Sequence, residues 1–110
     1  MRRKLRAADW PEADRMMWQA LLARGGPLDE AGALGHLRAS SAESFAKAYG
    51  FWLAHLAEAD PSALREPPAA RATVPRLRRW VAAMADLSAT TRQIRLGLTL
   101  RILQAGAPEA

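Results

Sequence analysis

Residues 88–104 have the periodicity of one long helix, but their apolar side chains lie on two sides of that helix. At 100° per residue they form two stripes, Ile94, Leu98 and Ile102 on one side and Leu96, Leu100 and Leu103 on another. Ser88 is the expected N-cap, and Gly106 and Pro108 follow the end of the pattern. A helix with two apolar sides either lies at the centre of its domain or packs against a molecule outside this chain.

Three other long helices are predicted, and no segment has a convincing strand alternation. They cover about residues 11–24, 40–60 and 73–87. Ser40 or Ser41 is the expected N-cap of the second, and the third opens at Thr73 with Pro75 in its first turn. A weak short helix is expected at 29–38 and an ordered loop at 61–72. The patterns predict an all-α fold, a compact bundle of four main helices in a single domain over residues 9–110.

The first three of these helices each carry one apolar stripe, and together the stripes are expected to form the core. Their members are Trp10, Met17, Trp18, Leu21 and Leu22; Phe45, Tyr49, Trp52, Leu53 and Leu56; and Leu77, Trp80, Val81, Met84 and Leu87. Phe51 is an exception, because it shares the outward side of its helix with Lys47. It is expected to cover the short helix near residues 29–38 or to mark a contact with another protein.

The basic residues are unevenly placed within a formal net charge of +5. Seven arginines lie in residues 71–101, where Asp86 is the only acid: Arg71, Arg76, Arg78, Arg79, Arg92, Arg95 and Arg101. Residues 1–8 hold four more bases and are expected to form a disordered arm, whereas nine acids outnumber five bases in residues 9–70. A one-signed stripe beside a basic arm is typical of a protein that binds a polyanion such as nucleic acid.

Several kinds of chemistry are excluded by what the sequence lacks. It has no cysteine, and its two histidines, His36 and His55, have no cysteine or nearby carboxylate that would make them metal ligands. Gly25-Gly26 lacks the Lys-Ser or Lys-Thr of a phosphate-binding loop, and Tyr49 is expected to pack in the core. We therefore expect no enzyme activity, metal, cofactor or small-molecule substrate.

The location of the protein is predicted from two features of the chain. The basic start is followed by Asp9, Pro11, Glu12 and Asp14 instead of the apolar core of a signal peptide. No stretch approaches the roughly twenty apolar residues of a membrane span. We expect a cytoplasmic protein without membrane attachment.

A series of short motifs along the chain carries a family resemblance. The series is Trp10-Pro11 with Asp14 and Trp18, Tyr49-Gly50-Phe51-Trp52-Leu53, Ala70-Arg71-Ala72-Thr73, Thr90-Thr91-Arg92 and Ala107-Pro108. In this series the chain resembles the N-terminal core-binding domain of phage-integrase-type tyrosine recombinases, over about residues 8–110. The resemblance implies a SAM-like module of two crossed helix pairs that clamps one face of duplex DNA. It also implies that the second and fourth long helices meet the major groove.

The catalytic domain of the resembled family has no counterpart in this chain, which ends at Ala110. The resemblance therefore implies a role in DNA integration or recombination without catalysis. A natural truncation, one product of a split gene and an isolated domain are the alternatives. The partners that follow are double-stranded DNA and either a separately encoded catalytic domain or a second copy bound through the last helix.

The candidate DNA contacts come from three helices. They are Ser40, Ser44 and Lys47 on the second long helix, Arg76 and Arg79 on the third, and Arg92, Arg95 and Thr99 on one polar strip of the fourth. Short hydroxyl donors and arginines are suited to phosphate oxygens. The alternative is a helical protein interaction module that uses Phe51 and the stripe of Leu96, Leu100 and Leu103, with its arginines only as solvated surface.

Overall fold

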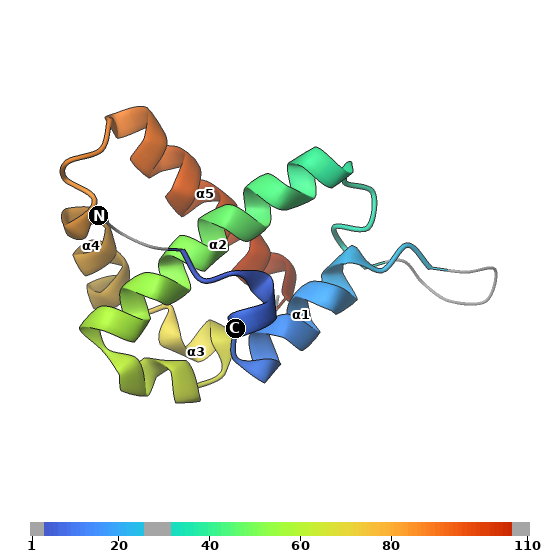
Figure 1. Cartoon of the computed structure of the whole chain (residues 1–110), viewed down its shortest axis with the longest axis horizontal. Coiled ribbons are helices and arrows are strands. Elements are labelled where there is room, and N and C mark those ends of the chain that lie inside the picture. Colours follow the sequence, from blue (N-terminus) through green and yellow to red (C-terminus); the bar gives the residue numbers. More distant parts are fainter. Residues whose placement is uncertain (1–3, 26–31, 107–110) are drawn as a thin grey trace.

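The computed structural model describes residues 4–25 and 32–106, and all the regular elements in these two ranges are helices. The chain runs through η1 (Ala7–Asp9), α1 (Glu12–Leu22), α2 (Ala39–Ala59), η2 (Pro61–Arg65), α3 (Pro68–Arg71), α4 (Val74–Ala83) and α5 (Ala89–Gly106) (Figure 1). The elements η1 and η2 are 3-10 turns. The predicted all-α class and the four main helices are confirmed.

Two helix starts follow the sequence prediction and one does not. The Thr73 hydroxyl accepts a hydrogen bond from the Arg76 backbone N–H at 3.4 Å, and the Ser88 hydroxyl accepts one from Thr91 N–H at 3.1 Å. Helix α2 instead begins at Ala39, with Arg38 at the N-cap position and no side-chain cap. The prediction of Ser40 or Ser41 as the cap was wrong, because the helix begins before either serine and includes both.

The connecting segments also differ from the prediction. Residues 61–72 hold η2 and α3 instead of an irregular loop. The expected short helix at 29–38 lies partly outside the described residues, and its described part, 32–38, is a turn at residues 33–36 without a helix. Helix α4 ends at Ala83, earlier than the predicted end at Leu87, and a turn leads to α5.

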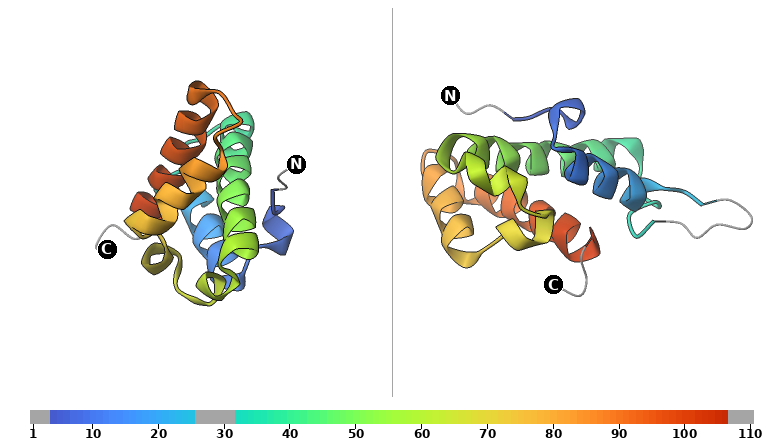
Figure 2. Two further views of the ribbon diagram at one scale, coloured as in Figure 1. Left: turned by 90° about the vertical axis from the view of Figure 1, so that its left-hand side faces the viewer. Right: turned by 90° about the horizontal axis from the view of Figure 1, so that it is seen from below.

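Aromatic side chains from several helices make the centre of the core. Trp52 of α2 lies 5.2 Å from Trp80 of α4 between ring centroids, and Trp10 lies 5.1 Å from Tyr49. The three tryptophans and Tyr49 are buried, as their stripes predict. Helix α5 runs along α2 on the other side from the N-terminal segment (Figure 2). This arrangement places α2 in the middle of the molecule.

The two apolar stripes of α5 are covered at its C-terminal end and open towards its N-terminal end. Ile102 and Leu103, one from each stripe, are buried, whereas Leu96, Leu98 and Leu100 are half-buried and Ile94 is 55 % exposed. The C-terminal half of α5 is therefore a central helix in the sense that the sequence predicts. Its N-terminal half is part of the surface.

A buried polar cluster joins α1, α2 and α3. The Tyr49 hydroxyl donates to Asp14 Oδ1 at 2.5 Å, and Arg71 Nη1 donates to the same oxygen at 2.7 Å. Burial, followed by the charge of Asp14, raises the pKa of Tyr49 well above its usual range. Arg71 has no exposed surface, so counting it in a solvent-facing basic stripe was wrong. Its charge is used inside the fold.

The remaining donors of Arg71 hold the segment between α2 and α3. Its Nε donates to the Ala63 carbonyl at 2.9 Å, and its Nη2 donates to the carbonyls of Leu64 at 3.0 Å and Glu66 at 2.6 Å. The Leu64 and Glu66 carbonyls gain a donor in this way, and the Ala63 carbonyl accepts from Arg71 in addition to the Glu66 backbone N–H at 3.1 Å. The side chain therefore fixes the path of η2.

The N-terminal segment crosses α2 at Gly50. Leu5 N–H donates to the Gly50 carbonyl at 3.0 Å, and Trp10 Nε1 donates to the Leu5 carbonyl at 2.8 Å. A Cβ at position 50 would lie 2.4 Å from the Leu5 oxygen, so the close approach requires glycine. Residues 1–3 of the expected disordered arm lie outside the described residues. For residues 4–8 the expectation fails, because this part is packed on α2.

Candidate nucleic-acid interface

A groove lies between the N-terminal halves of α2 and α5, where the two helices diverge (Figure 1). Its cavity has a volume of about 230 Å³. The side chains that line it are Ser44, Lys47, Ala48 and Phe51 from α2, and Thr91, Ile94, Arg95 and Leu98 from α5. None of these residues is acidic, whereas Lys47 and Arg95 are cationic at neutral pH. We refer to these eight residues as the α2–α5 groove.

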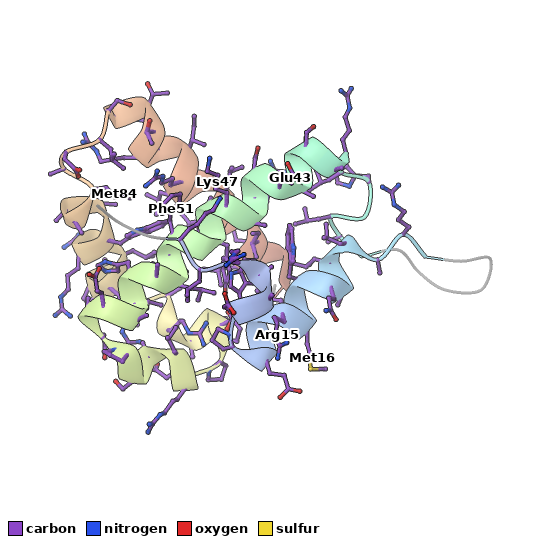
Figure 3. All side chains as sticks on the ribbon, in the orientation of Figure 1. Arg15, Met16, Glu43, Lys47, Phe51 and Met84 are labelled. Carbon is purple, nitrogen blue, oxygen red and sulfur yellow. The ribbon has the colours of Figure 1, made fainter. Side chains whose placement is uncertain are left out.

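Three of the eight predicted contact residues meet in the α2–α5 groove: Ser44, Lys47 and Arg95. Ser40 is exposed one turn before Ser44. The Ser44 hydroxyl donates to the backbone carbonyl of Ser40 at 3.2 Å. Lys47 is exposed on the side of α2 that faces the start of α5 (Figure 3). The groove thus brings together residues that lie about fifty positions apart in the sequence.

The outward position of Phe51 is explained by Arg95. The guanidinium carbon of Arg95 lies 3.7 Å from the centroid of the Phe51 ring, which is the geometry of a cation–π contact. Phe51 is one helical turn from Lys47 on α2, and both side chains line the groove together with Arg95. Of the two expected roles for Phe51, covering the short helix is not seen, because its partner is on α5. The guanidinium keeps its charge in this stack.

Arg92 has a different position from Arg95, although both are on the first turns of α5. It is not among the residues that line the groove, and its Nη1 donates to the carbonyls of Leu87 at 2.5 Å and Ala85 at 3.4 Å. These carbonyls belong to the turn between α4 and α5. Arg92 therefore helps to set the start of α5 at the edge of the groove.

The predicted polar strip of Arg92, Arg95 and Thr99 does not exist as one surface. Thr99 has no exposed area, so its place among the surface contacts was wrong. The strip is interrupted because helices pack on α5 from this level towards its C-terminal end, where Ile102 and Leu103 are also buried. Helical periodicity gives the side of a helix but not the point along it where a neighbouring helix begins to cover it.

The two predicted arginines of α4 lie apart from the groove, in a region with acids. Arg76 donates to Glu66 through Nη1 at 3.1 Å and Nη2 at 2.8 Å, and through Nε to Asp60 at 3.1 Å. Its side chain is only 19 % exposed. The hydrogen bond from Arg76 lowers the pKa of Glu66. The positive charge of Arg76 is therefore balanced within the protein.

Asp60 belongs to the same acidic region, and its carboxylate interacts with the charge of Arg79. The pKa of Asp60 is lowered first by the hydroxyl of Ser62, which donates to it at 2.8 Å, and then by Arg76 and Arg79. Arg79 is exposed, and its charge acts on the same carboxylate. Arg76 and Arg79 thus lie on the side of the molecule that carries Asp60 and Glu66, and neither lines the groove.

A second hollow, of about 470 Å³, lies on the other side of α2 and shares Lys47 with the groove. It is formed where the N-terminal segment crosses the helix, and it adds the bases Lys4 and Arg6 and the acid Glu43. Sequence reasoning assigned these two bases to a free arm. Gly50 in mid-helix was the one signal of a close backbone approach that could have placed them here.

Five groove residues were not predicted as DNA contacts: Ala48, Phe51, Thr91, Ile94 and Leu98. Ile94 and Leu98 belong to an apolar stripe that the sequence places either in the core or against another molecule, and only the packing shows that this stripe is open at its N-terminal end. Thr91 is part of the Thr90-Thr91-Arg92 motif. Its position three residues after the predicted cap Ser88 indicates a residue of the first helical turn, and it does not by itself indicate a groove residue.

No metal site and no membrane-spanning helix are found among the described residues. These residues contain no group of three or more histidine, cysteine, aspartate and glutamate side chains with the spacing for a metal ion. His55 stacks on Trp52, with 6.2 Å between ring centroids. Within the same ranges no helix combines the length and the apolar character needed to cross a bilayer.

No family model, curated protein sequence or solved structure matches this chain. Function is therefore inferred from the geometry and charge of the α2–α5 groove and from the motifs of the sequence.

Proposed function

We propose that this chain binds duplex DNA through the α2–α5 groove and performs no catalysis itself. The observation that carries the proposal is the convergence of Lys47 and Arg95, from two helices, on a surface with no acid among its described lining residues. Cationic side chains that converge on one surface from two helices attract a polyanion.

The helix ends beside the groove support the same ligand. Helices α2 and α5 begin on either side of it, at Ala39 and Ala89 (Figure 1). The first backbone N–H groups of a helix lack partners within it, and together with the helix dipole they favour phosphate oxygens. At α5 one of these groups, the Thr91 N–H, already donates to the Ser88 hydroxyl. Exposed hydroxyls of Ser40 and Ser44 add neutral donors near the start of α2. The groove is thus bordered by donors suited to the phosphate oxygens of the two DNA strands.

The resemblance to recombinase core-binding domains agrees with this location. It implies that the second and fourth long helices meet DNA, and these helices are α2 and α5, the two that form the groove. Under this proposal the bundle is a SAM-like module of crossed helix pairs, and Lys47 and Arg95 contact phosphates on the rims of the major groove. Integration or recombination chemistry would then come from a catalytic domain supplied by another part or another chain.

The test is a titration of fluorescein-labelled duplex DNA by fluorescence anisotropy at several salt concentrations. We expect a Kd of about 10⁻⁴ to 10⁻⁶ M near physiological salt, the range of binding that rests on phosphate contacts. The double variant Lys47→Ala with Arg95→Ala should weaken binding by on the order of tenfold. The slope of log affinity against log salt should become shallower by about 2, one for each lost phosphate contact.

The matched control removes two positive charges from another part of the surface. Arg15→Ala with Arg24→Ala changes the net charge equally. Both residues are exposed, Arg15 on α1 (Figure 3) and Arg24 shortly after its end. Arg92 stays unchanged in both variants, because it also holds the turn before α5. Equal losses from the two double variants would mean that net charge alone matters, and absence of binding by the wild-type chain even at low salt would reject the proposal.

A second candidate function, self-association as a helical interaction module, is favoured by a different surface. An apolar hollow of about 270 Å³ between α4 and α5 is lined by Val74, Leu77, Arg78, Val81, Leu96 and Leu100. It contains Leu96 and Leu100 of the second α5 stripe, and Val74 at its edge is 58 % exposed. Sedimentation of the free chain distinguishes the candidates, because an apolar dimer persists at high salt whereas phosphate binding is lost.

A further inference from the structure

Ile94 is a large exposed apolar side chain in the groove that Lys47 and Arg95 also line. It is 55 % exposed, and among the described residues only Met16 and Val74 are comparable exposed large hydrophobics. Neither of those lines the α2–α5 groove, whereas Ile94 does and is adjacent in sequence to Arg95. Below it the groove is lined by the half-buried side chains of Phe51 and Leu98. The groove therefore combines an apolar patch with two positive charges.

An apolar patch has one specific counterpart in the major groove of DNA. The C5-methyl of thymine is the apolar group that an unmodified base pair presents there, and the other groups on the base edges are hydrogen-bond donors and acceptors. Phosphate contacts position a protein but carry no sequence information, so Lys47 and Arg95 alone would not select a sequence. Ile94 is held on the first half of α5, an 18-residue helix, which fixes its direction relative to both charges.

We infer that Ile94 is a specificity-determining residue that contacts the C5-methyl of thymine, with Phe51 and Leu98 completing the apolar patch. This inference rests on the proposed DNA binding and adds a preference for A·T-containing sites to it. Burial of one methyl group between apolar side chains corresponds to about a fourfold gain in affinity for each thymine contacted. Since Ile94 is not part of the buried core, this preference is separable from stability.

The experiment compares two duplexes that differ only in methyl groups. One is an alternating A·T duplex, and in the other every thymine is replaced by deoxyuridine, which pairs with adenine in the same way but lacks the C5-methyl. Wild-type protein should bind the thymine duplex about fourfold more tightly. Ile94→Ala should bind both duplexes equally, with an affinity close to that of wild type for the deoxyuridine duplex. Ile94→Leu should retain part of the difference.

The control variant is Val74→Ala, which shortens a similarly exposed aliphatic side chain in the hollow between α4 and α5. It should keep the full preference for thymine. Thermal melts of all variants, followed by circular dichroism, should coincide with that of wild type to within a few degrees, because surface truncations have small effects on stability.

The outcomes separate this inference from the proposed function. If wild type binds neither duplex at low salt, the proposed DNA binding fails and the inference fails with it. If it binds both duplexes equally, DNA binding stands and the role of Ile94 is overturned. A preference for thymine that persists in Ile94→Ala also overturns it, because the methyl is then recognised elsewhere or through duplex shape. A dimer that dissociates in Ile94→Ala while DNA affinity is unchanged would assign the patch to self-association instead.

Discussion

Two regions of the molecule use arginine in opposite ways. At the junction of α1, η2, α3 and α4, Arg71 and Arg76 are surrounded by the chain's own acids and carbonyls. In the α2–α5 groove, Arg95 stacks on an aromatic ring and shares its surface with Lys47, with no acid among the described lining residues. We refer to the first region as the internal arginine cluster. The same residue type stabilises the fold in one region and provides a surface charge in the other.

This difference limits what a run of arginines in a sequence can predict about the charge of the folded surface. Arg71, Arg76 and Arg95 all belong to the basic stretch 71–101, and charge counting gives them equal weight. Arg71 and Arg76 are paired with acids distant in sequence: Asp14 is 57 residues from Arg71, and Asp60 is 16 from Arg76. Charge counting along the sequence therefore does not distinguish an arginine whose charge is used inside the fold from one that lines a groove.

The largest effect is expected from the innermost side chain. Arg71→Met should destabilise the protein by about 3 to 5 kcal/mol, because it leaves the buried carboxylate of Asp14 without its positive partner. For a domain of this size that corresponds to a fall in Tm on the order of 12 °C or more. Differential scanning calorimetry would measure it. All three carbonyl bonds that hold η2 are lost as well, because methionine has no donor.

A double variant tests the cause of this loss. Asp14→Leu with Arg71→Met removes the charge and its partner together, and it should cost less than the sum of the two single variants. Additive losses would show that Asp14 and Arg71 are not energetically coupled, and the internal arginine cluster would then be only a set of backbone bonds. The outcome decides whether charge pairing is what distinguishes this region from the groove.

A much smaller effect on stability is expected at the groove. Arg95→Met keeps most of the aliphatic side chain and removes the charge above Phe51, so the loss should be about 0.5 to 1 kcal/mol, the value of an exposed cation–π contact. Chemical denaturation with urea would resolve it. Arg101→Met is the matched control, since its guanidinium carbon lies farther from a ring, at 5.0 Å from Phe45. A loss at Arg95 as large as that at Arg71 would remove the contrast between the regions.

The helices and their aromatic core could be predicted from the sequence because they depend on local periodicity and caps. Trp52 and Trp80 are buried as their stripes require, and the Thr73 and Ser88 caps form. The cap of α2 was missed because a serine near a helix start is as compatible with the first turn as with the cap position. Helix ends depend on bonds that residues outside the periodic pattern make, so they are less well defined by sequence.

The candidate site could be predicted only in part, for a different reason. Ser44, Lys47 and Arg95 were found because they lie outside apolar stripes, and the groove brings them together. Thr99 was predicted at the surface but is buried, and the two-striped pattern left open whether Ile94 is covered, since both outcomes depend on where the neighbours of α5 pack on it. Pairing between distant residues, such as Arg71 with Asp14, leaves no local pattern in the sequence.

The smallest effect is expected at Arg76, and it should depend on pH. The pKa of Glu66 is lowered by its hydrogen bonds to Arg76, and that of Asp60 is lowered by Ser62 and then by Arg76. A carboxyl group with a lowered pKa in the folded state stabilises the fold above its unfolded pKa, about 4, and this stabilisation disappears as the pH falls through the folded pKa. Arg76→Gln should therefore melt slightly below wild type at pH 7, and the two curves should converge as the pH falls through the lowered pKa values of both carboxyl groups.

Arg78→Gln is the control for this last comparison, because Arg78 is exposed on the same helix and lines the apolar hollow beside α5. It should melt like wild type from pH 7 to pH 3. Tm measured by circular dichroism across this range gives the result. If the gap between wild type and Arg76→Gln stayed constant with pH, the bonds of Arg76 to Glu66 and Asp60 would not be its source. Arg76 would then stabilise the fold through its remaining bond, the 3.3 Å contact of Nη1 with the Arg71 carbonyl. Backbone contacts would then hold the internal arginine cluster, and its acids would contribute little to the stability of the fold.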